Sequence, residues 1–154
     1  MPPSEIQLDG SEAFEAPPER LYGLLSDLDA AARFIPDLTE PQRVDENTLR
    51  CKVRPGLSFL RGTLKLTVTL SDLVPNQSAT MRAQAKGIGA EMEVVTRMTI
   101  MPGEDGGSQL DWAATVEKRK GLVAPVSASL VRAAADHVVG RTWKKVRKEL
   151  GEAS

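Results

Sequence analysis

The chain has 154 residues, which suits a single domain that can bury a core without disulfides or structural metals. Its 20 basic and 21 acidic residues nearly balance, which argues against a dedicated nucleic-acid binder. The single cysteine, Cys51, excludes an internal disulfide and a multi-cysteine metal site, and we expect it to be a small buried hydrophobe. We therefore expect one domain over residues 1–154, with its core between about residues 5 and 150.

The N-terminal part of the chain predicts a strand followed by two short helices. Residues 6–15 alternate loosely, and Gly10 is expected to mark a bend in that strand. Two prolines then open a helix with leucines at helical spacing, namely Leu21, Leu24, Leu25 and Leu28. A second helix is expected from about Asp29, its predicted N-cap, to Phe34.

A period of two dominates the middle of the chain. Apolar and polar residues alternate over residues 49–54, 63–70, 79–86, 91–101 and 110–117. The segment 91–101 is less regular, because Val95 and Met101 fall on the face opposite Met92 and Met98. Turn residues separate the segments at 45–47, 74–77, 87–89 and 102–107. This pattern is typical of an antiparallel sheet that buries one face.

The last thirty residues return to helical spacing, which predicts a helix from about Leu122 to Leu150 with Pro125 in its first turn. Its expected apolar stripe comprises Val126, Leu130, Ala133, Ala134, Val138 and Trp143 or Val146. The apolar face of the sheet needs a cover, and this helix is the only large partner available. We therefore predict an α+β fold, in which a curved antiparallel sheet of six or seven strands surrounds a long C-terminal helix.

This order of elements resembles the START/Bet v 1-like superfamily, whose fold is called helix-grip. The segment from Gly10 to Asp27 is similar to the opening of the carbon monoxide dehydrogenase CoxG family, and residues 34–37 resemble that family's Cys-Ile-Pro-Gly. Weaker matches follow in the same order at residues 52–56, 86–89, 110–116 and 121–125. The chain departs from the family at Phe34 and Asp37. No membrane-anchoring segment follows Ser154, which some members carry, so membrane recruitment is in doubt.

The resemblance implies a non-enzymatic module that binds a lipophilic small molecule, or one that is accessory to a molybdenum-containing hydroxylase. No cofactor, metal or nucleic-acid partner is expected. The first ten residues lack the basic and apolar regions of a signal peptide, so the expected location is the cytoplasm. A peripheral contact with a membrane or a redox enzyme is a further expectation. One candidate surface is the basic end of the long helix, which comprises Arg141, Lys144, Lys145, Arg147 and Lys148.

The residues predicted to face the helix are mostly small or flexible, and such a lining favours an apolar cavity over a tightly packed core. The expected ligand-binding walls are Phe34, Ile35, Phe59, Met81, Met92, Met98, Trp112, Leu130, Ala134, His137 and Val138. A polar ligand end would meet His137, Arg82 or Thr96. The alternative is that these residues simply pack a core.

No catalytic motif stands out, and no catalytic residue is predicted. His137, the only histidine, is the one candidate base for the alternative of a cyclase or dehydratase that uses the same cavity. Asp27, Asp29 and Asp37 lie near one another in the sequence, and they suit helix caps and loops better than a catalytic carboxylate pair. A third hypothesis is an assembly factor that acts through its outer surface.

Overall fold

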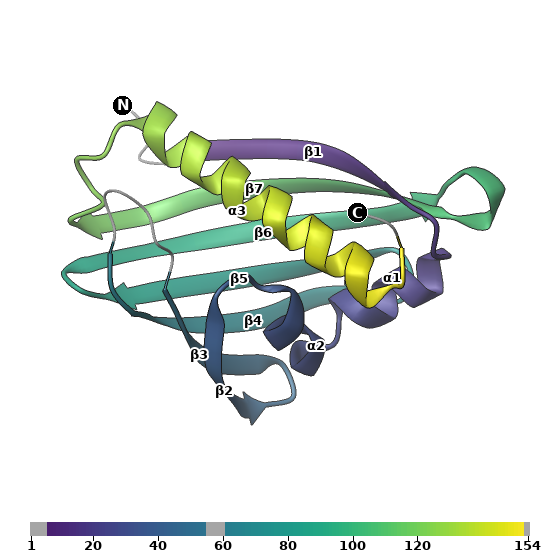
Figure 1. Cartoon of the computed structure of the whole chain (residues 1–154), viewed down its shortest axis with the longest axis horizontal. Helices are drawn as coiled ribbons and strands as arrows, with labels where there is room; N and C mark the ends of the chain where they lie inside the picture. The colour runs from purple at the N-terminus through teal and green to yellow at the C-terminus, as the bar shows by residue number, and fades with distance from the viewer. Residues whose placement is uncertain (1–5, 55–60, 153–154) are drawn as a thin grey trace.

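A computed structural model describes residues 6–54 and 61–152 of the chain. This part forms one antiparallel sheet of seven strands with a long helix lying diagonally across one face (Figure 1). The elements in chain order are β1 (Ile6–Phe14), α1 (Pro18–Leu25), α2 (Leu28–Phe34), β2 (Leu38–Asp45), β3 (Thr48–Val53), β4 (Leu64–Val74), β5 (Ser78–Gly87), β6 (Ala90–Pro102), the 3-10 turn η1 (Glu104–Gly106), β7 (Ser108–Gly121) and α3 (Ala128–Glu149). The predicted α+β helix-grip architecture is confirmed.

The strands are ordered β1-β7-β6-β5-β4-β3-β2, so the first and second strands of the chain form opposite edges. Every predicted strand is present, but β2 was not anticipated. Its residues from Thr39 to Asp45 are all exposed, because it is an edge strand without a buried face. Such a strand carries no alternation of apolar and polar residues to detect.

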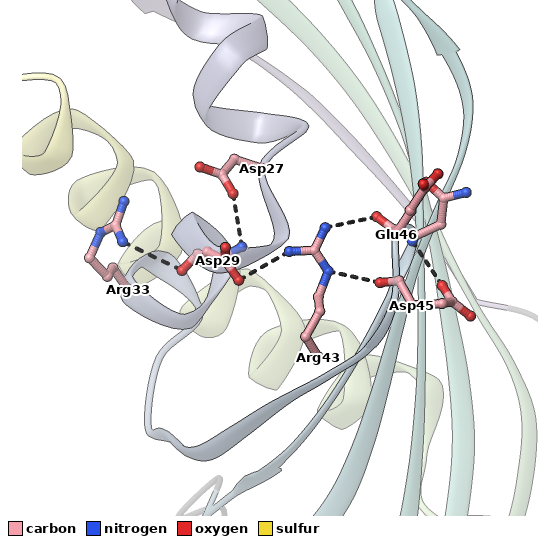
Figure 2. A network of polar contacts seen from close by, with 7 residues as sticks. Asp27, Asp29, Arg33, Arg43, Asp45 and Glu46 are labelled. Carbon is pink, nitrogen blue, oxygen red and sulfur yellow. Dashed lines mark hydrogen bonds and ion pairs between the residues drawn. The ribbon is translucent and has the colours of Figure 1, made fainter.

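Helix α2 is tied to the neighbouring strands by a polar network that Figure 2 shows. The side chain of Asp27 accepts a hydrogen bond from the Asp29 backbone N–H at 2.9 Å, so Asp27 is the N-cap and the prediction of Asp29 is wrong. Asp29 instead pairs with Arg43 at 3.1 Å. Arg43 also donates to the carbonyl oxygens of Asp45 at 2.8 Å and Glu46 at 3.0 Å, which fastens α2 to the turn between β2 and β3.

Helix α3 begins later than predicted. Residues 121–126 form consecutive turns, and Ser127 caps the helix by accepting a hydrogen bond from the Leu130 backbone N–H at 3.3 Å. Pro125 therefore lies outside the helix. The predicted apolar stripe is wrong by about one position over the first half of α3. The side chains turned toward the core are Val131, Ala135, Val139, Trp143, Val146 and Leu150.

An aromatic cluster closes the sheet against the C-terminal half of α3. The ring of Trp143 meets Phe14 edge-on at a centroid distance of 6.1 Å and Trp112 at 6.4 Å. All three rings are at least nine-tenths buried. The short helices cover the same end through Leu21, Leu25 and other buried side chains, as the positions of α1 and α2 in Figure 1 indicate. This end of the molecule is therefore filled core.

An ion pair joins the loop before β2 to the middle of α3. Both carboxylate oxygens of Asp37 accept hydrogen bonds from the Arg141 guanidinium, at 2.8 and 3.2 Å. The hydrogen bond from Arg141 holds the pKa of Asp37 below its ordinary value. Arg141 is thus engaged within the fold rather than available to a membrane or partner.

We expect Asp37→Asn to lower the free energy of unfolding by about 0.5–1 kcal/mol at pH 7, since the pair is partly exposed to solvent. Asparagine tolerates the positive φ of 61° at this position, so the backbone should be retained. A lowered folded-state pKa stabilises the protein above the unfolded pKa, and that contribution is lost as the pH falls. Urea unfolding should therefore show the difference between wild type and Asp37→Asn shrinking below about pH 4. A difference that is unchanged at pH 3 would contradict the assignment.

Candidate functional site

The candidate site is the centre of the sheet face that is turned toward α3. Cross-strand pairing places Ala83 of β5 between Val68 of β4 and Val94 of β6. Six inward residues of β3, β5 and β6 remain partly exposed, although they lie on the apolar side of the sheet: Val53, Met81, Ala83, Met92, Val94 and Thr96. Toward the ends of the same strands, the inward residues Leu70, Ala79, Met98 and Ile100 are buried. Solvent therefore reaches the middle of the inner face but not its aromatic end.

The helix leaves this area uncovered because of where its backbone runs. Helix α3 makes its main backbone approaches to β1 and α2, and not to β4, β5 or β6. Its inward side chains at this level, Ala135 and Val139, are short and partly exposed. Short residues on the helix and on β5 thus face each other across the central strands. This arrangement leaves apolar surface that a lipophilic molecule could cover.

The structure places the predicted wall residues in three different environments. Phe34, Met98 and Trp112 are fully part of the buried core. Ile35, Met81, Met92, Ala134 and Val138 are partly exposed, and the first three pack against that core. Leu130 is 43% exposed and His137 is exposed, because the stripe of α3 that faces the sheet begins at Val131. Phe59 lies outside the described residues. Residues that sequence reasoning left out of the walls are Val53, Ala83, Val94, Ala135 and Val139.

Neither of two side chains that were predicted to hold a polar ligand end points to the inner face. Arg82 lies on the opposite face, where it pairs with Glu93 and, at 3.6 Å, with Glu117. His137 lies on the exposed side of α3, away from the sheet. Only Thr96, which is partly exposed on the inner face between Met81 and Ala114, is positioned for that role. The position of His137 argues against a reaction in which it acts as the base.

The three aspartates near the short helices each have a structural partner. Asp27 caps α2, Asp29 pairs with Arg43, and Asp37 pairs with Arg141. The structure therefore supports caps and ion pairs as the role of these carboxylates. At the basic end of α3, Arg147 is likewise engaged by Glu12 at 2.9 Å, and its guanidinium lies 4.7 Å from the centre of the Phe14 ring.

Cys51 is buried on β3, and burial raises the pKa of its thiol to about 11. The thiolate is the reactive form of cysteine, so at pH 8 only about 0.1% of the side chain would be reactive even if the reagent reached it. We expect Ellman's reagent at pH 8 to modify the native protein at a negligible rate and the urea-unfolded protein within minutes. Rapid modification of the native protein would show that β3 opens or that Cys51 is accessible.

The fold has many structural relatives of low sequence identity. A conserved protein from Geobacillus kaustophilus is 17% identical with a TM-score of 0.87, and the match covers 95% of each chain. A START superfamily protein from Mycobacterium smegmatis is 15% identical with a TM-score of 0.71 and 94% and 96% coverage of this chain and of its own. Ara h 8.0201 is 13% identical with a TM-score of 0.67 and 96% and 99% coverage. These likenesses establish the START/Bet v 1-like fold.

No curated protein matches the sequence. Within the described residues, no helix combines the length and the apolar character that are needed to cross a membrane. The family model of carbon monoxide dehydrogenase CoxG matches residues 10–151, which is nearly the whole chain and includes every element from the end of β1 to α3. The chain therefore belongs to the carbon monoxide dehydrogenase CoxG family.

Proposed function

We propose that this protein binds a lipophilic small molecule between the sheet and α3 and does not transform it. The observation that carries the proposal is the partly exposed apolar surface at the centre of the inner face, around Met81, Ala83, Met92 and Val94. Apolar surface beneath a helix gains free energy when a ligand displaces water from it. At about 25 cal/mol per Å², covering about 300 Å² would supply about 7 kcal/mol before the costs of association. Methionine side chains can adapt such a wall to ligands of different shape.

The composition of this surface supports binding over catalysis. Among the described residues on the inner face of the central strands, the only ionisable side chain is Cys51, whose thiol stays protonated near neutral pH. General acid–base catalysis requires a titratable group within hydrogen-bond reach of the reacting atoms. The buried carboxylate of Glu93 belongs to the opposite face, where it is held by ion pairs. A cyclase or dehydratase would need a group that this surface does not offer.

The family's name supports a second part of the proposal, that the bound molecule serves an enzyme of the carbon monoxide dehydrogenase type. This part rests on the name alone. Purification of that enzyme from cells that express a tagged form of this chain should recover the two together. Purification of the enzyme without the tagged chain, at native expression levels and low salt, would count against it.

Binding can be tested by titration with N-phenyl-1-naphthylamine, a neutral apolar fluorophore. We expect saturable binding with an increase in probe fluorescence and a decrease in emission from Trp112 and Trp143, which lie at the buried end of the same face. Trp112→Phe should remove most of the decrease in protein emission. His137→Ala serves as the control and should leave the affinity within twofold, because His137 is exposed on the far side of α3. Non-saturable binding would overturn the proposal.

A further inference from the structure

The face of the sheet turned away from α3 carries a groove of about 750 Å³, a volume within the usual range for small-molecule sites. Its lining is polar and comes from six strands, β2 to β7. It lies on the opposite side of the sheet from the proposed lipophile site, so its function is independent of the proposal above.

Cross-strand pairing lines up like charges in this groove. Lys65 on β4 is directly opposite Lys52 on β3 and directly opposite Lys86 on β5. Side chains that are directly opposite in an antiparallel pair lie about 5 Å apart at Cβ, and like charges at that separation destabilise the sheet. The row of three lysines therefore disfavours folding unless an anion lies over it.

Most charges in the groove already have partners, and the exceptions lie together. Each carboxylate of the groove is paired: Glu40 with Lys52 at 3.3 Å, Glu91 with Lys86 at 3.5 Å and Lys120 at 3.7 Å, and Glu93 with Lys118 at 2.8 Å and with Arg82. Lys65 and Arg50 have no ion-pair partner among the described residues. They sit on adjacent strands, because Arg50 is opposite Thr67, two residues along β4 from Lys65.

Glu93 explains why the positive charge concentrates at Arg50 and Lys65. Its carboxylate is almost fully buried, and burial alone would raise its pKa, but the ion pairs with Lys118 and Arg82 outweigh burial and lower it. It therefore stays ionised and occupies the cations of β5 and β7. Thr67 and Gln84, which lie between Arg50 and Glu93 in the same cross-strand row, add neutral polar groups to the floor.

We propose that this outer groove binds a soluble small molecule that carries phosphate groups, with Lys65 and Arg50 as its principal charged contacts. A guanidinium can hold a phosphate through two parallel hydrogen bonds, and lysine ammonium groups bind phosphate as point charges. The groove is larger than a single phosphate needs. We therefore expect a ligand with two phosphate groups or with one phosphate group on a larger polar body.

The test uses inorganic pyrophosphate as the probe, with calorimetric titration and thermal unfolding at about 50 mM salt to limit screening. We expect saturable binding to wild type and an increase in its Tm. Lys65→Glu should weaken the affinity about 10- to 100-fold, the effect of losing a hydrogen bond to a charged group. Without pyrophosphate the same variant should have a higher Tm than wild type, since the new carboxylate would lie between Lys52 and Lys86. A merely structural lysine would not combine higher stability with lost binding.

Two further variants keep the result interpretable. Arg50→Gln should also weaken pyrophosphate binding at least tenfold, and it is the second test if Lys65→Glu folds poorly. Lys144→Ala, which removes the same charge from the exposed side of α3, should bind as wild type does. Pyrophosphate affinity that is equal in wild type and in both groove variants would overturn the proposal, as would no binding to wild type at millimolar concentration.

A lipid headgroup offers the same phosphate chemistry, so a second arm uses sedimentation with vesicles of phosphatidylglycerol and phosphatidylcholine. We expect no difference between wild type and Lys65→Glu in this assay. Vesicle binding that Lys65→Glu abolishes, in a protein that does not bind pyrophosphate, would show a membrane surface and overturn the assignment of a soluble ligand. Binding of N-phenyl-1-naphthylamine should be equal in wild type and Lys65→Glu, because the two sites lie on opposite faces.

Discussion

Replacing Ala83 with phenylalanine is expected to abolish binding of a lipophile while the protein remains folded. Ala83 lies at the centre of the inner face, between the inward side chains of Val68 and Val94, and it is partly exposed. A phenyl ring at this position would occupy the space above the sheet that a ligand needs. The ring would also cover apolar surface, so we expect the urea midpoint to be unchanged or slightly higher. Titration with N-phenyl-1-naphthylamine should show at least a 100-fold loss of affinity, about 2.7 kcal/mol.

A matched variant on the other face controls for the substitution itself. Ala113 is exposed on β7, on the outer face of the sheet, so Ala113→Phe adds the same ring to the same sheet without entering the proposed space. It should bind the probe as wild type does. If Ala83→Phe instead lowers the free energy of unfolding by about 1–3 kcal/mol, as overpacking of a filled core does, the space is packed and the proposed site does not exist.

Gly10→Ala should destabilise the protein strongly for the size of the change. A Cβ at Gly10 would lie 2.8 Å from Cζ2 of Trp112 and 2.9 Å from its indole nitrogen. The Trp112 ring cannot move away easily, because it is 8% exposed and rests on Trp143. We expect a loss of about 1–3 kcal/mol in the free energy of unfolding. The predicted bend at Gly10 therefore has a specific cause, the close passage of β1 over an aromatic ring on β7.

Gly140→Ala provides the matched comparison for that variant. Gly140 is exposed on α3, and a Cβ there would meet nothing within 4 Å. Alanine is the better helix former by about 0.5–1 kcal/mol, so this substitution should stabilise the protein by that amount. Chemical unfolding of both variants should therefore give shifts of opposite sign. Equal shifts, or a stabilised Gly10→Ala, would contradict the placement of Trp112 against β1.

Much of the fold follows from local sequence patterns, because each strand with one buried face alternates apolar and polar residues. The segments at 63–70 and 110–117 correspond to β4 and β7 with only small differences in their bounds. The edge strand β2 could not be found in this way, since it buries neither face. The irregular segment at 91–101 is also explained. Val95 lies on the outer face and is 4% exposed, and a change of register separates Glu91 from Glu93 in the pairing of β6 with β7.

The candidate site was predicted less well, because its residues depend on the phase of one helix. Taking Val126 as the first inward residue placed Leu130, Ala133 and His137 on or near the core side. The turns at residues 121–126 delay the start of α3, and the inward positions then fall at Val131 and Ala135. The lysine row of the outer groove could not be predicted either. Each lysine was expected to face outward, but only the pairing of β3, β4 and β5 brings the three together.

Native mass spectrometry most directly tests whether this protein carries a lipophile between its sheet and α3. The wild-type protein, purified without detergent from its own host, should carry an apolar small molecule at a ratio of one to one. Ala83→Phe should be free of that molecule, whereas Ala113→Phe should retain it. Wild-type protein without any bound molecule, or equal occupancy in both variants, would contradict the proposed site.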